Sequence, residues 1–478
     1  MHDLALEKTG RLGLMPRALV TVCLICLPWS ATWSSLTGHD LARVAQAALG
    51  SACALWLLLS PPARLPMGKA SGLLALLLCC LAAAATLGAP HVWAALRELT
   101  LFAGMVAIAW VCSRVVKPVW LIRVGAVSSA AYAAVFLVVA LLAAATANTP
   151  EDHRHLFTGY DNYRFLNHVQ TVTLPLLIAA TVTAVERGRW LKLAWFAHIT
   201  GWMLLFFTMG RGTLLGLAVG ATVVGLLLRD RARSYLQHML VGVLAGAGTK
   251  VVLTWWLPAW GDVVPSLGLT GQLSDARSAY SRFGLWELAL NYIGESPWFG
   301  IGPMHYANRP NVEAAHPHNI YLQVAAEWGV PMLAGSLAAA LWALWTLGQA
   351  VRCVHSPGDR AVGAALLMAC CAVMVDGGFS GNFVMPMSQL WIAVLIGVAW
   401  GWTHSQPLHV ALDECRTPTK QHRFVTRLAA VAMMSLQLWL WFSISPDLLD
   451  LNAHLVSISD KVALSTRLSP RFWSNGWF

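Results

Sequence analysis

Long apolar runs, separated by short polar segments, recur along the whole chain of 478 residues. Each run has about 20 residues, the length that a helix needs to cross the hydrocarbon core of a bilayer. Because unpaired backbone groups cannot face lipid, each run is expected to be helical. The pattern therefore predicts an all-α, polytopic membrane protein.

Twelve of these runs are long enough to count as transmembrane helices. They are 18–36, 41–60, 70–89, 97–113, 119–146, 168–185, 190–208, 212–228, 236–257, 328–350, 361–380 and 386–403. A thirteenth apolar stretch, 424–443, is either a further span or a helix at the membrane interface.

The polar connections divide the chain into four parts. Residues 1–257 hold the first nine spans and a medium loop at 147–167, 258–327 form one large helical loop, 328–443 hold the later spans, and 444–478 form a tail. Within the large loop, apolar residues recur at spacings of three to four, namely Tyr280, Phe283, Trp286 and Leu290. This spacing predicts an amphipathic helix over 276–293.

Basic residues fall mainly on one side of the predicted membrane. With the N-terminus in the cytoplasm, 20 of the 32 Lys and Arg residues lie in seven short inner segments, as the positive-inside rule predicts. Topology therefore explains most of the net charge of +10, and no nucleic-acid partner is expected. Only 11% of the residues are charged, against about 25% in soluble domains.

Two arginines on the predicted outer side are candidates for anion binding. Arg211 lies between two glycines at the junction of two spans, against the positive-inside bias. It either snorkels to anchor a helix end or binds an anion, because a charge at the membrane margin is costly unless it is hydrated, paired or used. Arg282 shares a helix face with Trp286, and taken alone it fits a solvated charge equally well.

The segment around His316 and His318 carries the candidate general base. Two histidines two residues apart suggest a metal site, but no third ligand with matching spacing follows and the chain contains no D-x-D pair. No metal and no cofactor is therefore expected. His318 alone fits a general base, since an unperturbed pKa of about 6.5 lets imidazole accept a proton at neutral pH. A structural histidine at a helix start is the alternative.

Two carboxylates near these residues have two interpretations each. Glu327 either orients the site or solvates the helix that follows His318. Asp376, with Asn382 nearby, lies at the outer end of the eleventh predicted span. An ionisable residue at that depth is a functional candidate, although pairing with an outer arginine for structure explains it equally well.

Three motifs together resemble the O-antigen ligase and polymerase superfamily of bacterial surface-polysaccharide enzymes. Gly210-Arg211-Gly212 is similar to the family's Ser-Arg-Gly/Ala at a span junction. Arg282-x-x-x-Trp286, followed by Pro297-x-x-Gly300-x-Gly302, is similar to its R-x-x-x-W and P-x-x-G-x-G. His318-Asn319, nine residues and then Gly329 resemble the ligase signature H-[NSQ]-x9-G-x-x-[GTY].

The chain departs from the family pattern at two positions. Gly210 replaces the usual Ser, and Met332 stands where the ligase signature has Gly, Thr or Tyr. The second departure weakens the distinction between ligase and polymerase. The segment 162–175, with Arg164, Asn167 and His168, also resembles the family's polar entry to a span.

The resemblance implies a C-type glycosyltransferase of the bacterial inner membrane, with its active site facing the periplasm. A glycan on undecaprenyl diphosphate is the expected donor, lipid A–core oligosaccharide is the expected acceptor of a ligase, and membrane lipid surrounds both. His318 is the expected base of a metal-independent, inverting transfer, and Arg211 and Arg282 are expected to bind the diphosphate. The secondary site candidates are Arg164, Asn167, His316, Asn319, Glu327 and Asp376.

Three alternatives stay open. An O-antigen polymerase and a protein O-oligosaccharyltransferase belong to the same superfamily and share the chemistry. A lipid-linked glycan flippase or other transporter belongs to a different class. Transporters tend to show paired repeats and charges deep in several spans, whereas the candidate charges here gather on one face, which favours an enzyme.

Overall fold

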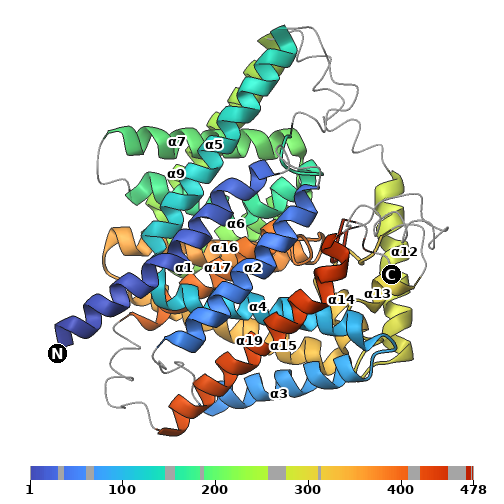
Figure 1. Ribbon diagram of the computed structural model, residues 1–478. Helices are drawn as coiled ribbons and strands as arrows, with labels where there is room; N and C mark the ends of the chain where they lie inside the picture. Colours follow the sequence, from blue (N-terminus) through green and yellow to red (C-terminus); the bar gives the residue numbers. More distant parts are fainter. Residues whose placement is uncertain are drawn as a thin grey trace.

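The computed structural model describes residues 2–30, 37–60, 69–145, 157–183, 188–256, 276–309, 314–406, 420–449, 470–474 and 476. Over these ranges the chain is mostly helical and has no strand (Figure 1). The all-α prediction is therefore confirmed for them. The predicted loop residues 147–156, 258–275 and 310–313 and the tail residues 450–469 lie outside the described residues.

The helices follow one another closely along the chain. Those before residue 257 are α1 (His2–Ser30), α2 (Gly38–Leu59), α3 (Lys69–Leu87), α4 (Val92–Val115), α5 (Pro118–Ala145), α6 (Tyr163–Thr183), α7 (Arg189–Thr208), α8 (Arg211–Leu228), the 3-10 helix η2 (Arg229–Ala232) and α9 (Arg233–Trp256). Those after it are α12 (Ala276–Glu295), α13 (His305–Asn308), α14 (Ile320–Trp328), α15 (Val330–Cys353), α16 (Pro357–Gly377), α17 (Pro386–His404) and α19 (Lys420–Leu449).

Every predicted span overlaps one of these helices, and the chain is a multi-pass membrane protein. Among the described residues, ten segments are long and apolar enough to cross a membrane, and one of them, Arg211–Thr254, joins the two spans predicted at α8 and α9. The predicted thirteenth span is among the ten, as Arg423–Leu449. The apolar part of α1, Gly13–Trp29, is shorter, and α17 is not among the ten. The number of crossings stays a prediction.

The helix α16 lies at the centre of the bundle and packs mainly against α8 and α6. Its contact with α8 is backbone to backbone. A Cβ added at Gly216 would lie 2.6 Å from the carbonyl oxygen of Ala372, and one added at Gly220 would lie 2.6 Å from that of Met368. Small residues four positions apart allow membrane helices to approach this closely. The start of α8 is thereby fixed against the end of α16.

A second contact of the same kind joins α17 to α4. A Cβ at Gly397 would clash with the carbonyl oxygen of Ala109, and one at Gly401 would clash with that of Ser113. Two pairs of glycines, each four residues apart, therefore hold the central helices at short distance. The first pair holds α8 against α16, and the second holds α17 against α4.

The amphipathic helix predicted in the large loop is present as α12, but the predicted apolar face is wrong. Phe283 is 64% exposed and Leu290 is 57% exposed, whereas Leu285, Ala289 and Tyr292 are buried against residues of α13 and α14. Both stripes recur at helical spacing, so spacing alone does not select between them. The small side chain of Ala289 favours the second stripe because it permits close approach of α14.

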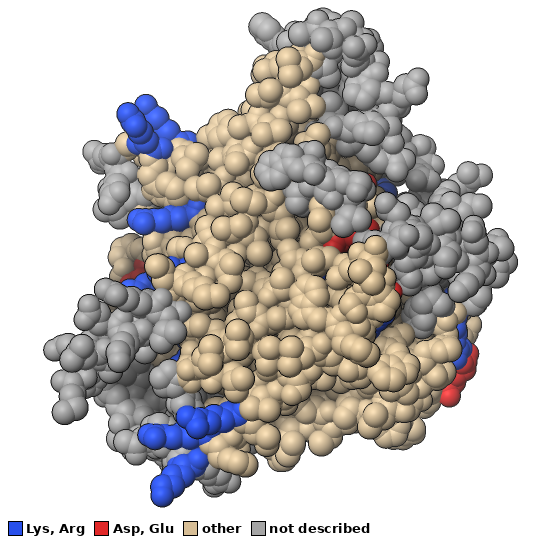
Figure 2. Space-filling view, in the orientation of Figure 1, with Lys and Arg blue, Asp and Glu red and all other residues tan. Residues whose placement is uncertain are grey.

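Charge is distributed unevenly over the surface. The face shown in Figure 2 is largely uncharged, and its Lys and Arg side chains gather on the side where α1 begins. The C-terminus lies on the opposite side, beside α12 and α13 (Figure 1). This arrangement agrees with basic segments facing one compartment and the large loop facing the other.

The α8–α16 contact leads to a test of the fold. We expect Gly216→Leu to destabilise the protein by more than the ~1–3 kcal/mol typical of overpacking, because the obstacle is backbone. Thermal unfolding in detergent, followed by size-exclusion chromatography, measures the effect. Gly72→Leu is the matched control, since a Cβ at that position of α3 meets no atom within 4 Å. Equal stability of the two variants would contradict the packing.

Candidate functional site

The candidate general base lies in the segment that leads into α14. Asn319 caps this helix, because its side-chain oxygen accepts hydrogen bonds from the backbone N–H groups of Tyr321 at 3.0 Å and Leu322 at 3.1 Å. His318, directly before it, has a φ of +52°, which non-glycine residues rarely adopt. Such strain is held by the surrounding structure and is common at functional sites. The cap therefore sets the direction in which the chain presents His318.

The two histidines of this segment are packed against each other. Their ring centroids lie 4.1 Å apart, and the backbone N–H of His318 donates to Nδ1 of His316 at 3.2 Å. His316 is buried and faces Gly381, where a Cβ would press on its ring. The bond assigns the acceptor role to Nδ1 of His316, so the neutral ring carries its proton on Nε2. His316 thus supports the backbone of His318.

The helix α12 holds this histidine segment through Trp286. The indole Nε1 of Trp286 donates to the carbonyl oxygen of Pro317 at 3.1 Å, and its ring lies 6.5 Å from that of Phe379. Arg282 lies one turn earlier on the same face of α12. The R-x-x-x-W motif therefore uses its tryptophan as an anchor that brings the arginine to the histidine segment.

The P-x-x-G-x-G motif packs backbone to backbone against the end of α14. The N–H groups of Ile301 and Gly302 donate to the carbonyl oxygens of Ala326 at 2.8 Å and Glu327 at 3.1 Å. Gly300 has a φ of +71°, and a Cβ there would clash with the backbone of Glu327. Only glycine fits both conditions. This motif fixes the end of α14 that lies away from His318.

Arg211 is the first residue of α8, directly after a left-handed turn at Met209 with a φ of +48°. The two flanking glycines make room for protein side chains. A Cβ at Gly210 would lie 2.7 Å from the side-chain amide of Asn167, and one at Gly212 would clash with the carboxylate of Asp376. The replacement of the family's serine by Gly210 is therefore explained, because Asn167 occupies that space.

Hydroxyl groups connect these side chains beneath Arg211. Thr208 donates to Oδ1 of Asn167 at 2.5 Å, and Thr213 donates to the carbonyl oxygen of Asn167 at 3.1 Å. Thr171 donates to Oδ2 of Asp376 at 3.2 Å. Asn167 and Asp376 are both buried, so this network joins α6, α8 and α16 at the position where Arg211 begins its helix.

Three arginines gather around this point. Burial lowers the pKa of Arg282, the positive charges of Arg164 and Arg211 lower it further, and Asp376 opposes them. Arg164 and Arg211 are exposed and Arg282 is half-buried. Arg164 lies in the first turn of α6, and Arg211 begins α8. Two helix N-termini therefore add to the positive potential.

His318 lies within the field of these arginines. Burial lowers the pKa of His318 to about 3, and the charges of Arg282 and Arg164 contribute to the shift. The imidazole is therefore neutral at physiological pH and has a nitrogen lone pair for a proton. His168, on α6, also interacts electrostatically with His318 and both of these arginines.

The structure thus brings seven of the predicted site residues together. These are His318, His316, Arg211, Arg282, Arg164, Asn167 and Asp376. Asn319 belongs to the same segment as a helix cap. Glu327 lies at the far end of α14, where it is completely buried and paired with Arg471. The interpretation of Glu327 as a solvating charge is therefore wrong.

Sequence reasoning missed the groups that hold the site from behind. In the sequence, Thr171 and Thr213 look like ordinary polar residues within apolar spans. The only signal that could have found them was their closeness in the chain to Asn167 and Arg211. Arg471 lies in the tail, and no sequence pattern pointed to its partners. A basic residue among Pro470, Phe472 and Trp473 was the only available signal.

Other features of the described residues lie elsewhere. Among these residues no group of three or more His, Cys, Asp or Glu side chains is placed to hold a metal ion. A cavity of about 690 Å³ is lined by Arg229, Asp230, Arg231 and Arg352 together with leucines. Another, of about 650 Å³, lies beside Trp93 and Phe442. Neither of these two cavities is lined by His318, Arg164, Arg211 or Arg282.

Comparison with known families identifies the central part of the chain. Residues 196–337 match the family model described as O-antigen ligase. The resemblance to the O-antigen ligase superfamily is thereby confirmed. The matched segment includes Arg211, Arg282 and His318, and it ends before Asp376. Comparison with curated proteins finds no match.

The electrostatics of His318 can be measured directly. An ordinary histidine is only roughly 3% neutral at pH 5, so its reaction with diethyl pyrocarbonate, which needs the neutral ring, slows about thirtyfold between pH 8 and pH 5. We expect the rate at His318, followed by peptide mass spectrometry, to change by less than about threefold. A histidine-containing peptide in the same tube is the control. A thirtyfold slowing at His318 would show that its pKa is ordinary.

Proposed function

We propose that the protein is an O-antigen ligase that transfers a glycan from undecaprenyl diphosphate to lipid A–core oligosaccharide at the periplasmic face of the inner membrane. One observation carries this proposal. A neutral histidine, His318, lies in the field of Arg282 and Arg164, and Arg282 in turn lies in the field of Arg211. The family match over residues 196–337 supports the same class of enzyme.

The arginines suit a diphosphate. Arg211 and Arg282 bind it through the paired N–H groups of guanidinium, which form bidentate, charge-assisted hydrogen bonds with phosphate oxygens. Arg164 adds a third positive charge on the open side. Because guanidinium stays charged at any working pH, this arrangement neutralises the leaving group without a metal ion. The bonds strengthen as negative charge develops on the departing phosphate oxygen.

His318 suits the acceptor side of the reaction. The acceptor sugar hydroxyl attacks the anomeric carbon of the donor, and its proton passes to the imidazole. The bond between the anomeric carbon and the phosphate oxygen breaks, undecaprenyl diphosphate leaves, and in-line attack inverts the anomeric centre. One glycosidic bond replaces one sugar–phosphate bond, and one proton is transferred.

Donor binding also prepares the base. In the free protein, burial lowers the pKa of His318 and the charges of Arg282 and Arg164 lower it further, which makes the imidazole a weak proton acceptor. A diphosphate bound to these arginines brings negative charge close to the ring and raises its pKa again. Donor binding therefore strengthens His318 as a base by offsetting the part of the pKa shift that the arginines cause.

The position of Met332 bears on the choice among related enzymes. Met332 is buried and packs with Ala85 and Trp328 between α3, α14 and α15. The last position of the ligase signature is thus a packing position in this chain, and its departure does not touch the reacting groups. The polymerase and the protein O-oligosaccharyltransferase share the donor chemistry, so the acceptor separates the three.

Replacement of the chromosomal gene by a His318→Ala allele tests the function. We expect transfer to fall by on the order of 10²–10⁴-fold, since the proton acceptor is lost. Polymeric glycan should accumulate on undecaprenyl diphosphate beside bare lipid A–core. His355→Ala, at an exposed position outside the site, is the control.

Other outcomes of this experiment identify the alternatives. Core that carries a single glycan repeat would indicate a polymerase. Donor trapped on the cytoplasmic side would indicate a flippase. Unchanged core glycosylation with loss of glycan from proteins would indicate a protein O-oligosaccharyltransferase. Full activity of His318→Ala would remove the base assignment.

Arg211→Lys tests the role of the guanidinium. We expect turnover to fall by about 10²-fold, because an ammonium group cannot form the planar pair of hydrogen bonds. Transfer from lipid-linked donor by purified protein measures it. Arg231→Lys, on the exposed η2 segment, should retain near-normal turnover. Near-normal turnover of Arg211→Lys would mean that this arginine only anchors a helix.

A further inference from the structure

The last described segment of the chain, 470–474, is inserted among the outer ends of several helices. Ser474 donates from its backbone N–H and its hydroxyl to the carboxylate of Asp40 at 2.7 Å and 2.8 Å. Trp473 donates from Nε1 to Asp447 at 3.0 Å. Both tail residues are buried. The segment is therefore part of the folded core and not a free end.

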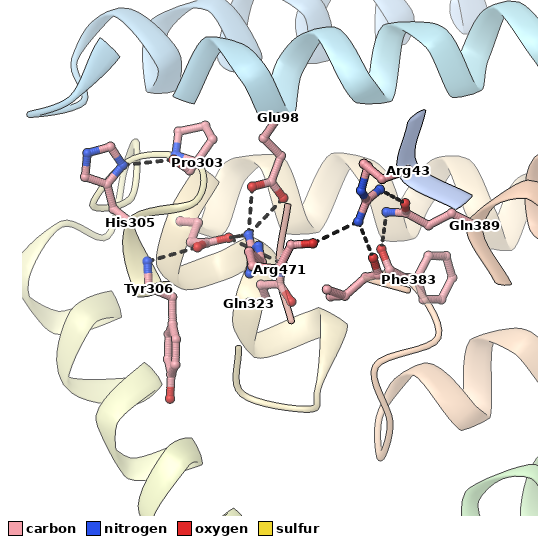
Figure 3. A network of polar contacts seen from close by, with 11 residues as sticks. Arg43, Glu98, Pro303, His305, Tyr306, Gln323, Phe383, Gln389 and Arg471 are labelled. Carbon is pink, nitrogen blue, oxygen red and sulfur yellow. Dashed lines mark hydrogen bonds and ion pairs between the residues drawn. The ribbon is translucent and has the colours of Figure 1, made fainter. Parts of the chain in front are cut away.

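Arg471 is the centre of this insertion (Figure 3). Its side chain is 3% exposed, and Nη2 donates to both carboxylate oxygens of Glu98 at 2.8 Å and to Glu327 at 2.5 Å. The amide oxygen of Gln323, when turned toward the guanidinium, accepts from Arg471 at 2.8 Å and 2.9 Å. One tail side chain thus joins α4 to two positions of α14.

The backbone of the same segment is held by a second buried arginine. Arg43 on α2 donates to the carbonyl oxygens of Arg471 and Phe472 at 2.8 Å and 2.9 Å. Arg43 also donates to the carbonyl oxygen of Val384 at 2.8 Å and to the side chain of Gln389 at 2.6 Å. The tail is thereby connected to the loop that follows Asp376 (Figure 3).

The network continues from Glu327 toward α12. The backbone N–H of Tyr306 donates to the carboxylate of Glu327 at 3.0 Å, and the hydroxyl of Tyr306 donates to the carbonyl oxygen of Leu285 at 2.9 Å. Leu285 lies one turn after Arg282 on α12. Arg471 is therefore connected through hydrogen bonds to the helix that carries a candidate diphosphate-binding residue.

The helix α14 depends on such support. It has nine residues, and a helix this short is not stable by itself in water. His318 lies just before its N-terminus, and Glu327 lies near its C-terminus, roughly 12 Å away at 1.5 Å per residue. Arg471 is paired with Glu327, so it fixes the far end of the helix that presents His318.

We propose that Arg471 is a positioning residue for glycosyl transfer, and that segment 470–474 completes the active site from behind. The proposal rests on the proposed function. The tail holds α14 through Glu327 and, through Arg43, the loop after Asp376, so the base and its surroundings keep one geometry. A misplacement of about 1 Å far from the chemistry lowers turnover by as much as about 10²-fold.

Two variants of Arg471 test the proposal in the full-length protein in nanodiscs. Arg471→Ala leaves Glu98 and Glu327 without their guanidinium. Arg471→Lys keeps the charge but loses the fork that reaches both carboxylates. Arg309→Ala is the matched control, since Arg309 forms an exposed ion pair with Glu295 on the same side of the molecule.

Kinetics with lipid-linked donor separate positioning from binding. We expect Arg471→Ala to lower kcat by about 10-fold to 100-fold and to change the donor KM by less than about threefold, since Arg164, Arg211 and Arg282 remain. Arg471→Lys should fall between wild type and Arg471→Ala. Arg309→Ala should stay within about twofold of wild type.

Hydrogen–deuterium exchange supplies a readout that needs no substrate. Exchange should rise in peptides covering 314–329 and 378–385 of the Arg471 variants, while peptides from α7 and α9 stay unchanged. If Arg471→Ala does not yield folded protein, Arg471→Lys decides by the same criteria. Unchanged kcat, unchanged exchange at 314–329, or a change confined to KM would each overturn the proposal.

Failure of the proposed function is distinguishable from failure of this inference. A wild-type protein that transfers no glycan would contradict the ligase assignment, whereas the exchange measurement would still report whether the tail holds α14. A wild-type protein that transfers glycan beside fully active Arg471 variants would overturn the positioning role alone.

Discussion

The structure depends on how charges are accommodated at the outer end of an apolar bundle. Burial of an unpaired charge is costly, so each charge must be met by an opposite charge, by hydrogen bonds or by a ligand. At Arg471 the demand is met within the protein, by Glu98 and Glu327. Among the described residues, Arg282 interacts electrostatically with the positive charges of Arg164 and Arg211 and with the carboxylate of Asp376. The first cluster holds structure, and under the proposed function the second binds the diphosphate.

The two clusters are mechanically related because α14 lies between them. Its N-terminal end carries Asn319, which caps the helix next to His318, and its C-terminal end carries Glu327 in the ion-paired network. The P-x-x-G-x-G segment binds the same C-terminal end through backbone hydrogen bonds. Because an ion pair and backbone contacts with glycines fix the C-terminal end of α14, the helix can hold His318 in a strained conformation at its N-terminal end.

Much of the fold and of the candidate site could be predicted from the sequence. The lipid environment determines both the length of the apolar runs and the side of the membrane on which the basic residues lie. The positions of the helices followed from apolar runs, and His318, Arg211 and Arg282 stood out by their motifs. The apolar face of α12 could not be predicted, because two stripes had the same spacing and only the partner helix selected Leu285 and Ala289. The role of Arg471 could not be predicted either, because its partner Glu98 is 373 positions away in the chain and no local pattern joins them.

Gly210 and Asn167 behave as a single unit across two helices. The amide of Asn167 fills the volume that a side chain at position 210 would need, so neither position is free to vary by itself. A relative with serine at the first of these positions requires a smaller side chain, or a different rotamer, at the second. Substitutions at these two positions should therefore appear together during divergence of the family, and the pair offers a way to align distant members whose intervening spans no longer resemble one another.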